Sequence, residues 1–338
     1  MVASSSAPYH ANIAVNGWCE ANCKLFLRVQ LKFAFCHIDI LHNVDYRIIG
    51  SMYWDMRAAV SSPAKPLPLQ APSVIVRHHE EGWRMDISGK VVAITGAAQG
   101  IGAALARAAH QHGAKAVACL DIDFGGAASV AHEINGLPIN VDVSIEADIT
   151  HAIDQIEDTL GPIDLFCSNA GILPHGGIDV PDDIWDRAWR INVMSHLWAA
   201  RRLIPAMSAR GGGYLLNTAS AAGLLNQIGS APYGVTKHAA VGLAEWLAMT
   251  HGDDGIGVSV LCPQGVRTAM IAGHEDHAAA ADGILEPEDV AEAAVQGIRD
   301  ETFLILPHAK VRDYMALKAN DYDRWLGGMR KLNRAYRS

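Results

Sequence analysis

Short runs of apolar residues alternate with longer segments of helical periodicity between residues 85 and 306. Each run is four or five residues long and almost unbroken by polar side chains, which is typical of strands buried on both faces of a parallel sheet. The predicted strands are Val91–Thr95, Ala116–Leu120, Pro138–Val141, Ile163–Cys167, Tyr214–Thr218, Val258–Cys262 and Phe303–Leu306. The predicted helices are Ile101–His112, Ala147–Leu160, Asp182–Ser208, Tyr233–His251 and Pro287–Gly297. This alternation predicts an α/β fold with a doubly wound parallel sheet, which binds ligands at the carboxyl ends of its strands.

The N-terminal part of the chain, before Met85, differs in composition from the rest. It carries eight Lys and Arg against six Asp and Glu, whereas the part that begins at Met85 carries 19 against 30. Four prolines between Ser61 and Pro72 are typical of an extended linker. We therefore predict a single catalytic domain over residues 85–338 and an N-terminal extension over residues 1–84. The alternative is that the native protein begins at Met85.

Charge and cysteine content narrow the range of partners and compartments. The net charge of −9 disfavours binding to nucleic acids and to anionic membranes. No stretch reads as a signal peptide or membrane span, because charged and polar residues interrupt the apolar segment from Leu25 to Leu41. Six scattered cysteines without an export signal indicate a reducing compartment, so we expect a cytoplasmic protein.

Two groups of residues are of the types that bind metals. Cys19, Cys23, Cys36 and His37 form the first group, but they lack the second paired motif of a typical zinc site. The second group, His274–His277, is interpreted as a solvated loop. We therefore predict no metal site.

A glycine-rich segment, Thr95–Gly102, joins the first predicted strand to an Ala-rich helix. Gly96 permits a tight turn, Gly100 lets the backbone approach a pyrophosphate, and Gly102 allows the helix to pack closely on the strand. The free N–H groups at the helix N-terminus bind phosphate charge. This position between strand and helix favours a Rossmann-type dinucleotide site over ordinary turns.

Asp121 lies at the end of the second predicted strand, which follows the glycine-rich segment and its helix. A carboxylate at this position accepts hydrogen bonds from both hydroxyls of an adenosine ribose and repels a 2′-phosphate. The next residues, Ile122 and Asp123, offer no cation for such a phosphate. The sequence therefore favours NAD over NADP.

Tyr233 and Lys237 lie one turn apart on one face of a predicted helix. A nearby ammonium lowers the pKa of a phenol, so such a pair exchanges a proton with an alcohol or carbonyl. Ser220 lies between the preceding strand and the helix of Tyr233, where its hydroxyl can hold the substrate oxygen. A second Tyr-x3-Lys pair, Tyr314–Lys318, lacks such a serine, and we interpret it as a solvated helix face.

These motifs, in this order, resemble those of the short-chain dehydrogenase/reductase family over about Asp86 to Leu306. The matching segments are TGAAQGIG at 95–102, Asp142-Val143, SNAG at 168–171, RINVMS around Asn192, NTASAAG with Ser220, YGVTK at 233–237 and CPQGVRT at 262–268. Two positions depart from the common pattern: Ser168 replaces Asn, and Gln264 stands where many members have Gly. Neither departure removes a reacting group.

The resemblance implies a role for each matching residue. Tyr233 would be the general acid and base, Lys237 would lower its pKa, Ser220 would orient the substrate, and Asn192 would support a water-linked proton relay. The implied cofactor contacts are Gly96, Gln99, Gly100, Ile101, Gly102, Asp121, Asp142, Val143, Asn169, Ala170, Gly171, Tyr233, Lys237, Val266 and Thr268. The implied reaction is hydride transfer between NAD(H) and a secondary alcohol or ketone. The alternative is an inactive NAD-binding sensor or scaffold, which is expected to lack one of the four catalytic groups.

Three segments are expected to form the substrate walls: Ile172–Gly177, Ala221–Ile228 and Ala269–Leu285. Their apolar residues favour a hydrophobic substrate; these are Leu173, Leu224, Leu225, Ile228, Met270 and Ile271. Their polar residues leave a sugar-like substrate open; these are His175, Asn226 and Gln227.

Two further features concern assembly. Two predicted helices carry more apolar residues than packing on one sheet face requires; examples are Trp198, Trp246 and Met249. The resemblance implies a homodimer or homotetramer formed through these helices. The basic tail over residues 308–338 is expected to dock on its own or a neighbouring subunit near the active site.

Overall fold

The computed structural model describes residues 85–273 and 282–336 of the chain. Within these residues, seven parallel strands form one sheet in the order β3-β2-β1-β4-β5-β6-β7. The strands are β1 (Val91–Thr95), β2 (Ala116–Asp121), β3 (Leu137–Asn140), β4 (Leu165–Ser168), β5 (Gly213–Thr218), β6 (Ile256–Leu261) and β7 (Leu304–Ile305). Each predicted strand overlaps one of these, and the predicted fold class is confirmed.

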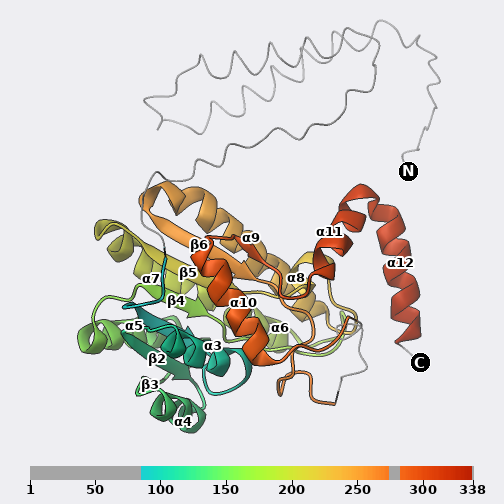
Figure 1. The fold of residues 1–338 in the computed structure, drawn as a ribbon. Coiled ribbons are helices and arrows are strands. Elements are labelled where there is room, and N and C mark those ends of the chain that lie inside the picture. Colours follow the sequence, from blue (N-terminus) through green and yellow to red (C-terminus); the bar gives the residue numbers. More distant parts are fainter. Residues whose placement is uncertain (1–84, 274–281, 337–338) are drawn as a thin grey trace, which may run out of the picture. The chain divides into compact units, whose positions relative to one another are not determined.

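Helices cover both faces of the sheet (Figure 1). The described α-helices, of which α11 and α12 lie away from the sheet, are α3 (Gly100–Gln111), α4 (Phe124–Glu133), α5 (Glu146–Leu160), α6 (Asp182–Trp189), α7 (Ser195–Ala209), α8 (Ala222–Leu225), α9 (Ala231–His251), α10 (Pro287–Arg299), α11 (Lys310–Asn320) and α12 (Tyr322–Ala335). The strand order reverses between β1 and β4, which are neighbours in the sheet. Such a reversal leaves a crevice at the carboxyl ends of the strands.

The predicted helix Asp182–Ser208 is divided in the structure. A π-helical turn, Arg190–Met194, lies between α6 and α7 and contains Asn192. The apolar periodicity continues through this turn, so the sequence shows no boundary there. A π-turn changes the helical phase of the residues after it.

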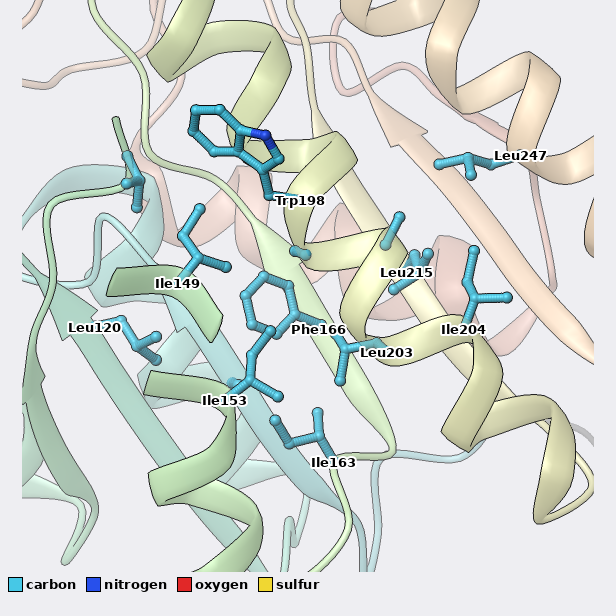
Figure 2. Close-up of a cluster of buried hydrophobic side chains, with 14 of the residues drawn as sticks. Leu120, Ile149, Ile153, Ile163, Phe166, Trp198, Leu203, Ile204, Leu215 and Leu247 are labelled. Carbon is cyan, nitrogen blue, oxygen red and sulfur yellow. The ribbon is translucent and has the colours of Figure 1, made fainter. Parts of the chain in front are cut away.

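Two apolar clusters, one on each face of the sheet, form the core. Figure 2 shows one of them, in which Ile149 and Ile153 of α5 and Leu203 of α7 pack around Phe166 of β4. Trp198 belongs to this cluster and is 5% exposed, so it is a core residue rather than a surplus apolar residue. Burial of such side chains is the main favourable contribution to folding.

The sequence reading missed α4 because two glycines open it. Asp123 caps its N-terminus by accepting a hydrogen bond from the Gly126 backbone N–H at 3.1 Å. A Cβ atom on Gly126 would lie 2.7 Å from that of Ala98. The glycine that weakens the helical pattern is therefore required by close packing against the glycine-rich loop.

The basic tail forms two helices, α11 and α12. Figure 1 shows α11 beside α8, with α12 as the outermost element of the described part of the chain. None of the described helices combines the length and the hydropathy that a membrane crossing requires. The predicted extension 1–84 and the two groups considered as metal ligands lie outside the described residues.

Candidate active site

A cavity of about 1080 Å³ lies at the carboxyl ends of the strands. The segments that follow β1, β2, β3, β4, β5 and β6 all contribute to its wall. The larger part of the cavity wall comes from segments in which the sequence predicted cofactor and catalytic residues. Its remaining wall comes largely from α11 and α12.

The glycine-rich loop is built by close approaches that only glycine permits. Gly96 has φ of +69°, and a Cβ atom on it would lie 2.9 Å from the Cα atom of Ala170. A Cβ atom on Gly102 would lie 2.0 Å from the carbonyl oxygen of Gly96. The glycines of the loop and of the N-terminus of α3 therefore form a cradle that a Cβ atom at these positions would obstruct, and this fits the pyrophosphate of a dinucleotide.

Thr95 ties this loop to the segment after β4. Its hydroxyl oxygen accepts hydrogen bonds from the backbone N–H groups of Asn169 at 2.9 Å and Ala170 at 3.1 Å. The Asn169 side-chain amide donates to the Thr95 carbonyl oxygen at 3.1 Å. The sequence reading gave Thr95 no role of its own, because its contacts come from a segment that is distant in the sequence.

Two carboxylates, those of Asp121 and Asp142, line the cavity at the ends of β2 and β3. Asp121 is half-buried, and its Oδ2 accepts a hydrogen bond from the Ala98 backbone N–H at 2.9 Å. Asp142 accepts one from the Ser144 backbone N–H at 2.9 Å. Asp121 Oδ1 also accepts a hydrogen bond from the Asp123 backbone N–H at 3.0 Å. Each carboxylate oxygen can accept more than one hydrogen bond, which leaves acceptor capacity for a ligand hydroxyl or amine.

Tyr233 and Lys237 lie in the first two turns of α9 and are both buried. Burial raises the pKa of Tyr233, and a hydrogen bond with Ser220 opposes this rise. Burial has the largest effect on this pKa, and the expectation that Lys237 lowers it stays a prediction. The phenol is neutral at neutral pH and is a proton donor.

Lys237 is held beneath this phenol. Its Nζ donates a hydrogen bond to the Thr218 carbonyl oxygen at 2.9 Å and lies 5.7 Å from the centroid of the Tyr233 ring. Burial lowers the pKa of Lys237 to about 8. A buried amine with such a pKa changes its charge readily near physiological pH.

Ser220 stands between β5 and α8 on the wall of the cavity. Its Oγ accepts a hydrogen bond from the Ala222 backbone N–H at 3.1 Å and donates one to the Pro263 carbonyl oxygen at 3.3 Å. The same hydroxyl forms a hydrogen bond with Tyr233. The rotatable hydroxyl can therefore exchange a protein partner for a substrate oxygen.

Asn192 is fully buried and does not line the cavity. Its amide nitrogen donates to the Ile172 carbonyl oxygen at 3.0 Å and to Thr236 Oγ1 at 3.0 Å, and its Oδ1 accepts from the Ile172 N–H at 2.9 Å. A Cβ atom on Gly171 would lie 3.3 Å from both Asn192 Oδ1 and Lys237 Nζ. The π-helical turn therefore places Asn192 behind the segment that faces Lys237.

The structure gathers almost all the sequence-predicted site residues around one cavity. Those that line it are Gly96, Gln99, Gly100, Ile101, Asp121, Asp142, Val143, Asn169, Ala170, Gly171, Ser220, Tyr233, Lys237, Val266 and Thr268. Gly102 and Asn192 stand behind the wall and support it. The glycine cradle and the two carboxylates fit a dinucleotide, so the residues present are compatible with a nicotinamide cofactor.

The substrate side of the cavity is only partly as expected. Five of the six predicted apolar residues line it, whereas Leu224 packs against α11 instead. Asn226 and Gln227 line it as well, but His175 does not. The central part of the predicted wall segment 269–285, namely residues 274–281, lies outside the described residues.

Sequence reasoning expected the C-terminal tail near the active site but did not identify which of its residues line the cavity. The residues of α11, α12 and their connection that line the cavity are Tyr314, Leu317, Asn320, Asp321, Arg324, Trp325, Gly328, Met329 and Leu332. The interpretation of Tyr314–Lys318 as a solvated helix face is wrong, because both residues are half-buried and bonded to cavity segments. The basic tail lies beside the cavity of its own subunit, as one of the two expectations had it.

The chain is similar to dehydrogenases of other organisms. It is 29% identical to human epidermal retinol dehydrogenase 2 over 235 residues, which cover 66% of this chain and 76% of the relative. It is 31% identical to 1-deoxy-11-beta-hydroxypentalenate dehydrogenase of Streptomyces exfoliatus over 239 residues, which cover 68% of this chain and 86% of the relative.

Solved structures agree with this likeness. A short-chain dehydrogenase/reductase from Burkholderia phymatum in complex with NAD superposes with a TM-score of 0.66 at 26% identity, covering 71% of this chain and 96% of that one. A short-chain type dehydrogenase/reductase from Mycobacterium marinum gives 0.63 at 28% identity, covering 67% and 96%. The family model for short chain dehydrogenases matches residues 90–279. The chain therefore belongs to the short-chain dehydrogenase family of oxidoreductases.

Proposed function

We propose that this protein transfers a hydride between NAD(H) and a secondary alcohol or ketone, with Tyr233 as the general acid and base. The observation that carries the proposal is the arrangement of Ser220, Tyr233 and Lys237. These side chains stand on one cavity wall, beside a glycine cradle that fits a dinucleotide. A bound nicotinamide supplies or accepts the hydride.

Residues on the cavity wall donate and accept the proton of the reaction. In ketone reduction, negative charge develops on the carbonyl oxygen, and the neutral phenol of Tyr233 donates its proton there. Ser220 donates a hydrogen bond to the same oxygen and holds it in place. In alcohol oxidation, the phenolate form of Tyr233 takes the hydroxyl proton. The ammonium of Lys237 stabilises that phenolate, and Asn192 supports a water-linked path for the proton.

A spectrophotometric screen tests this function. Purified protein is mixed with NAD and a panel of secondary alcohols, hydroxysteroids and sugars, and NADH formation is followed by absorbance. The proposal predicts turnover with at least one alcohol of hydrophobic bulk. Absence of turnover across the panel, together with unimpaired NADH binding, would instead favour the alternative of an NAD-binding sensor or scaffold.

The proposed cofactor is NAD rather than NADP. Support comes from Asp121, whose carboxylate stands at the cavity wall with Ile122 beside it. A 2′-phosphate placed against this carboxylate would experience charge repulsion. The NAD-bound Burkholderia relative is compatible with this preference.

We also propose a homodimer or homotetramer, and a cytoplasmic location. Trp246 and Met249 on α9 are 53% and 78% exposed, which is unusual for large apolar side chains on one helix. The described cysteines Cys119, Cys167 and Cys262 are buried free thiols, as expected in a reducing compartment. Residues 85–338 are the proposed catalytic domain, and residues 1–84 an extension of it.

A further inference from the structure

One carboxylate, that of Asp282, joins the segment after β6 to the C-terminal helices. Its Oδ2 accepts a hydrogen bond from Gln264 Nε2 at 3.2 Å, and its Oδ1 accepts one from the Tyr314 hydroxyl at 3.0 Å. Lys310 Nζ lies 3.1 Å from the same Oδ1. The side chain of Asp282 is only 6% exposed, although it lies on a connecting segment. Burial raises the pKa of Asp282, but these three partners outweigh that effect and lower it.

Gln264 connects this carboxylate to the segment that carries Val266 and Thr268. Its backbone N–H donates to Nδ1 of the buried His308 at 3.1 Å. Two further backbone bonds, between Leu285 and the residues on either side of Val266, pair this segment with the one that follows Asp282. The position of Gln264 is therefore fixed from both its main chain and its side chain.

The two ends of the Gln264 amide differ. Among the residues that the structure describes, none donates a hydrogen bond to the buried Oε1 of Gln264, whereas its Nε2 bonds Asp282. Glycine, the residue common at this position in the family, has no side chain that could make this bond. Gln264 therefore supplies a connection to Asp282 that glycine would lack.

On the other side, α11 is fastened at two points. Tyr314 bonds Asp282, and Lys318 Nζ donates a hydrogen bond to the Leu224 carbonyl oxygen of α8 at 2.6 Å. The second Tyr-x3-Lys pair thus attaches α11 to both segments that border the substrate site. The Tyr314 ring also contacts the ring of Trp325 in α12, with centroids 6.4 Å apart. This contact fixes α12 relative to α11.

The three polar contacts of Asp282 contribute unequally to this connection. Lys310 is 66% exposed, and exposed ion pairs contribute little to stability. The hydrogen bonds from Gln264 and Tyr314 are made to a carboxylate that is almost fully buried, so each is stronger. The link therefore depends mainly on Gln264, Asp282 and Tyr314.

We propose that Asp282 is a positioning residue, which with Gln264 and Tyr314 latches α11 and α12 in place as the outer wall of the substrate site. This wall presents Leu317, Trp325 and Met329 to the cavity. Resting on the proposed function, the inference is that the alcohol carries an apolar group bulky enough to reach α12. Without the latch, the wall separates from the segment of Gln264 and selection for that bulk is lost.

Hydrogen–deuterium exchange on the full chain tests the latch without requiring catalysis. The variants are Asp282→Asn and Tyr314→Phe, with Asp313→Asn as the matched control, an exposed acid on the same helix. The latch predicts roughly 3- to 10-fold faster amide exchange in α11 and α12 for both variants, as loss of one hydrogen bond gives. Exchange in β1 and α3, and throughout the control, should match the wild type.

The single variant Gln264→Gly and the double variant Gln264→Gly/Tyr314→Phe test whether these groups act as one unit. Exchange of the double variant in α11 and α12 should be no faster than that of the faster single variant, because either substitution already opens the latch. Unchanged exchange in the single variants, or an increase spread evenly over the whole domain, would overturn the proposal.

A selectivity ratio tests the inferred substrate class. The ratio of kcat/KM for decahydro-2-naphthol to that for cyclohexanol should fall roughly tenfold in Asp282→Asn and Tyr314→Phe, and remain unchanged in Asp313→Asn. A ratio that stays at the wild-type value despite faster exchange would overturn the selectivity role. Failure of the wild type to oxidise either alcohol would count against the proposed function, while the exchange result would still decide the latch.

Discussion

Lys237 Nζ donates a hydrogen bond to the carbonyl oxygen of Thr218 at 2.9 Å, beneath the ring of Tyr233. The last residue of β5 thereby fixes the ammonium of α9. This bond only partly offsets the removal of the charge from water, and burial lowers the pKa of Lys237 to about 8. The site therefore keeps a cation where the fold itself disfavours one.

A measurement of stability as a function of pH tests the free-energy cost of burying the Lys237 ammonium. Between pH 8 and the unfolded lysine value of about 10.4, the unfolded chain binds the proton that the folded chain has released, so stability rises with pH. Lys237→Met should therefore have a higher Tm than the wild type at pH 7, and this difference should shrink as the pH rises above 8. Differential scanning fluorimetry without added NAD measures it. A variant with a lower Tm at pH 7, or a difference independent of pH, would contradict this account.

The cofactor preference is expected to depend on the charge of Asp121. The variant Asp121→Asn keeps an oxygen that can accept the Ala98 N–H, so the glycine-rich loop retains its support, while the bond from the Asp123 N–H is lost. Loss of the negative charge should lower the ratio of kcat/KM for NAD to that for NADP by roughly 10- to 100-fold. Initial rates with each cofactor measure this ratio. An unchanged ratio would mean that another group selects the cofactor.

The close packing of the glycine-rich loop predicts a large effect at Gly102. In Gly102→Ala the added Cβ atom would lie 2.0 Å from the Gly96 carbonyl oxygen, so the loop must move. We expect a loss of roughly 1–3 kcal/mol in the free energy of unfolding, as for other overpacked sites. The control is Gly242→Ala in α9, where a Cβ atom meets nothing within 4 Å. Urea unfolding should show that Gly242→Ala is at least as stable as the wild type; equal losses in both variants would contradict the packing argument.

Much of the fold could be predicted because its signals are local. The apolar runs of the strands are continuous, and the glycine-rich loop and the pair of Tyr233 and Lys237 are each contained in a few residues. Helix α12 could not be recognised in this way, because none of its residues is buried and its polar residues dominate. The bond between Gln264 and Asp282 could not be predicted either, because it depends on how the segments after β6 fold against α11.

The pKa of Tyr233 shows a second limit of sequence reasoning. The spacing to Lys237 predicts that the two side chains share a helix face, and the structure places them so. The sequence does not give the degree of burial, which in the structure outweighs the other influences on this phenol. The balance between desolvation and charge becomes visible only when the surrounding elements are assembled.

The central claim is that Tyr233 is the proton donor and acceptor of an NAD-dependent dehydrogenase. The most direct test compares Tyr233→Phe with the wild type in two measurements: kcat for an alcohol that the wild type oxidises, and the Kd of NADH from fluorescence titration. The account predicts a loss of kcat of roughly 100-fold or more, as for removal of a general acid or base, with the Kd of NADH changed less than about threefold. A variant that retains the wild-type kcat would contradict the assigned role of Tyr233.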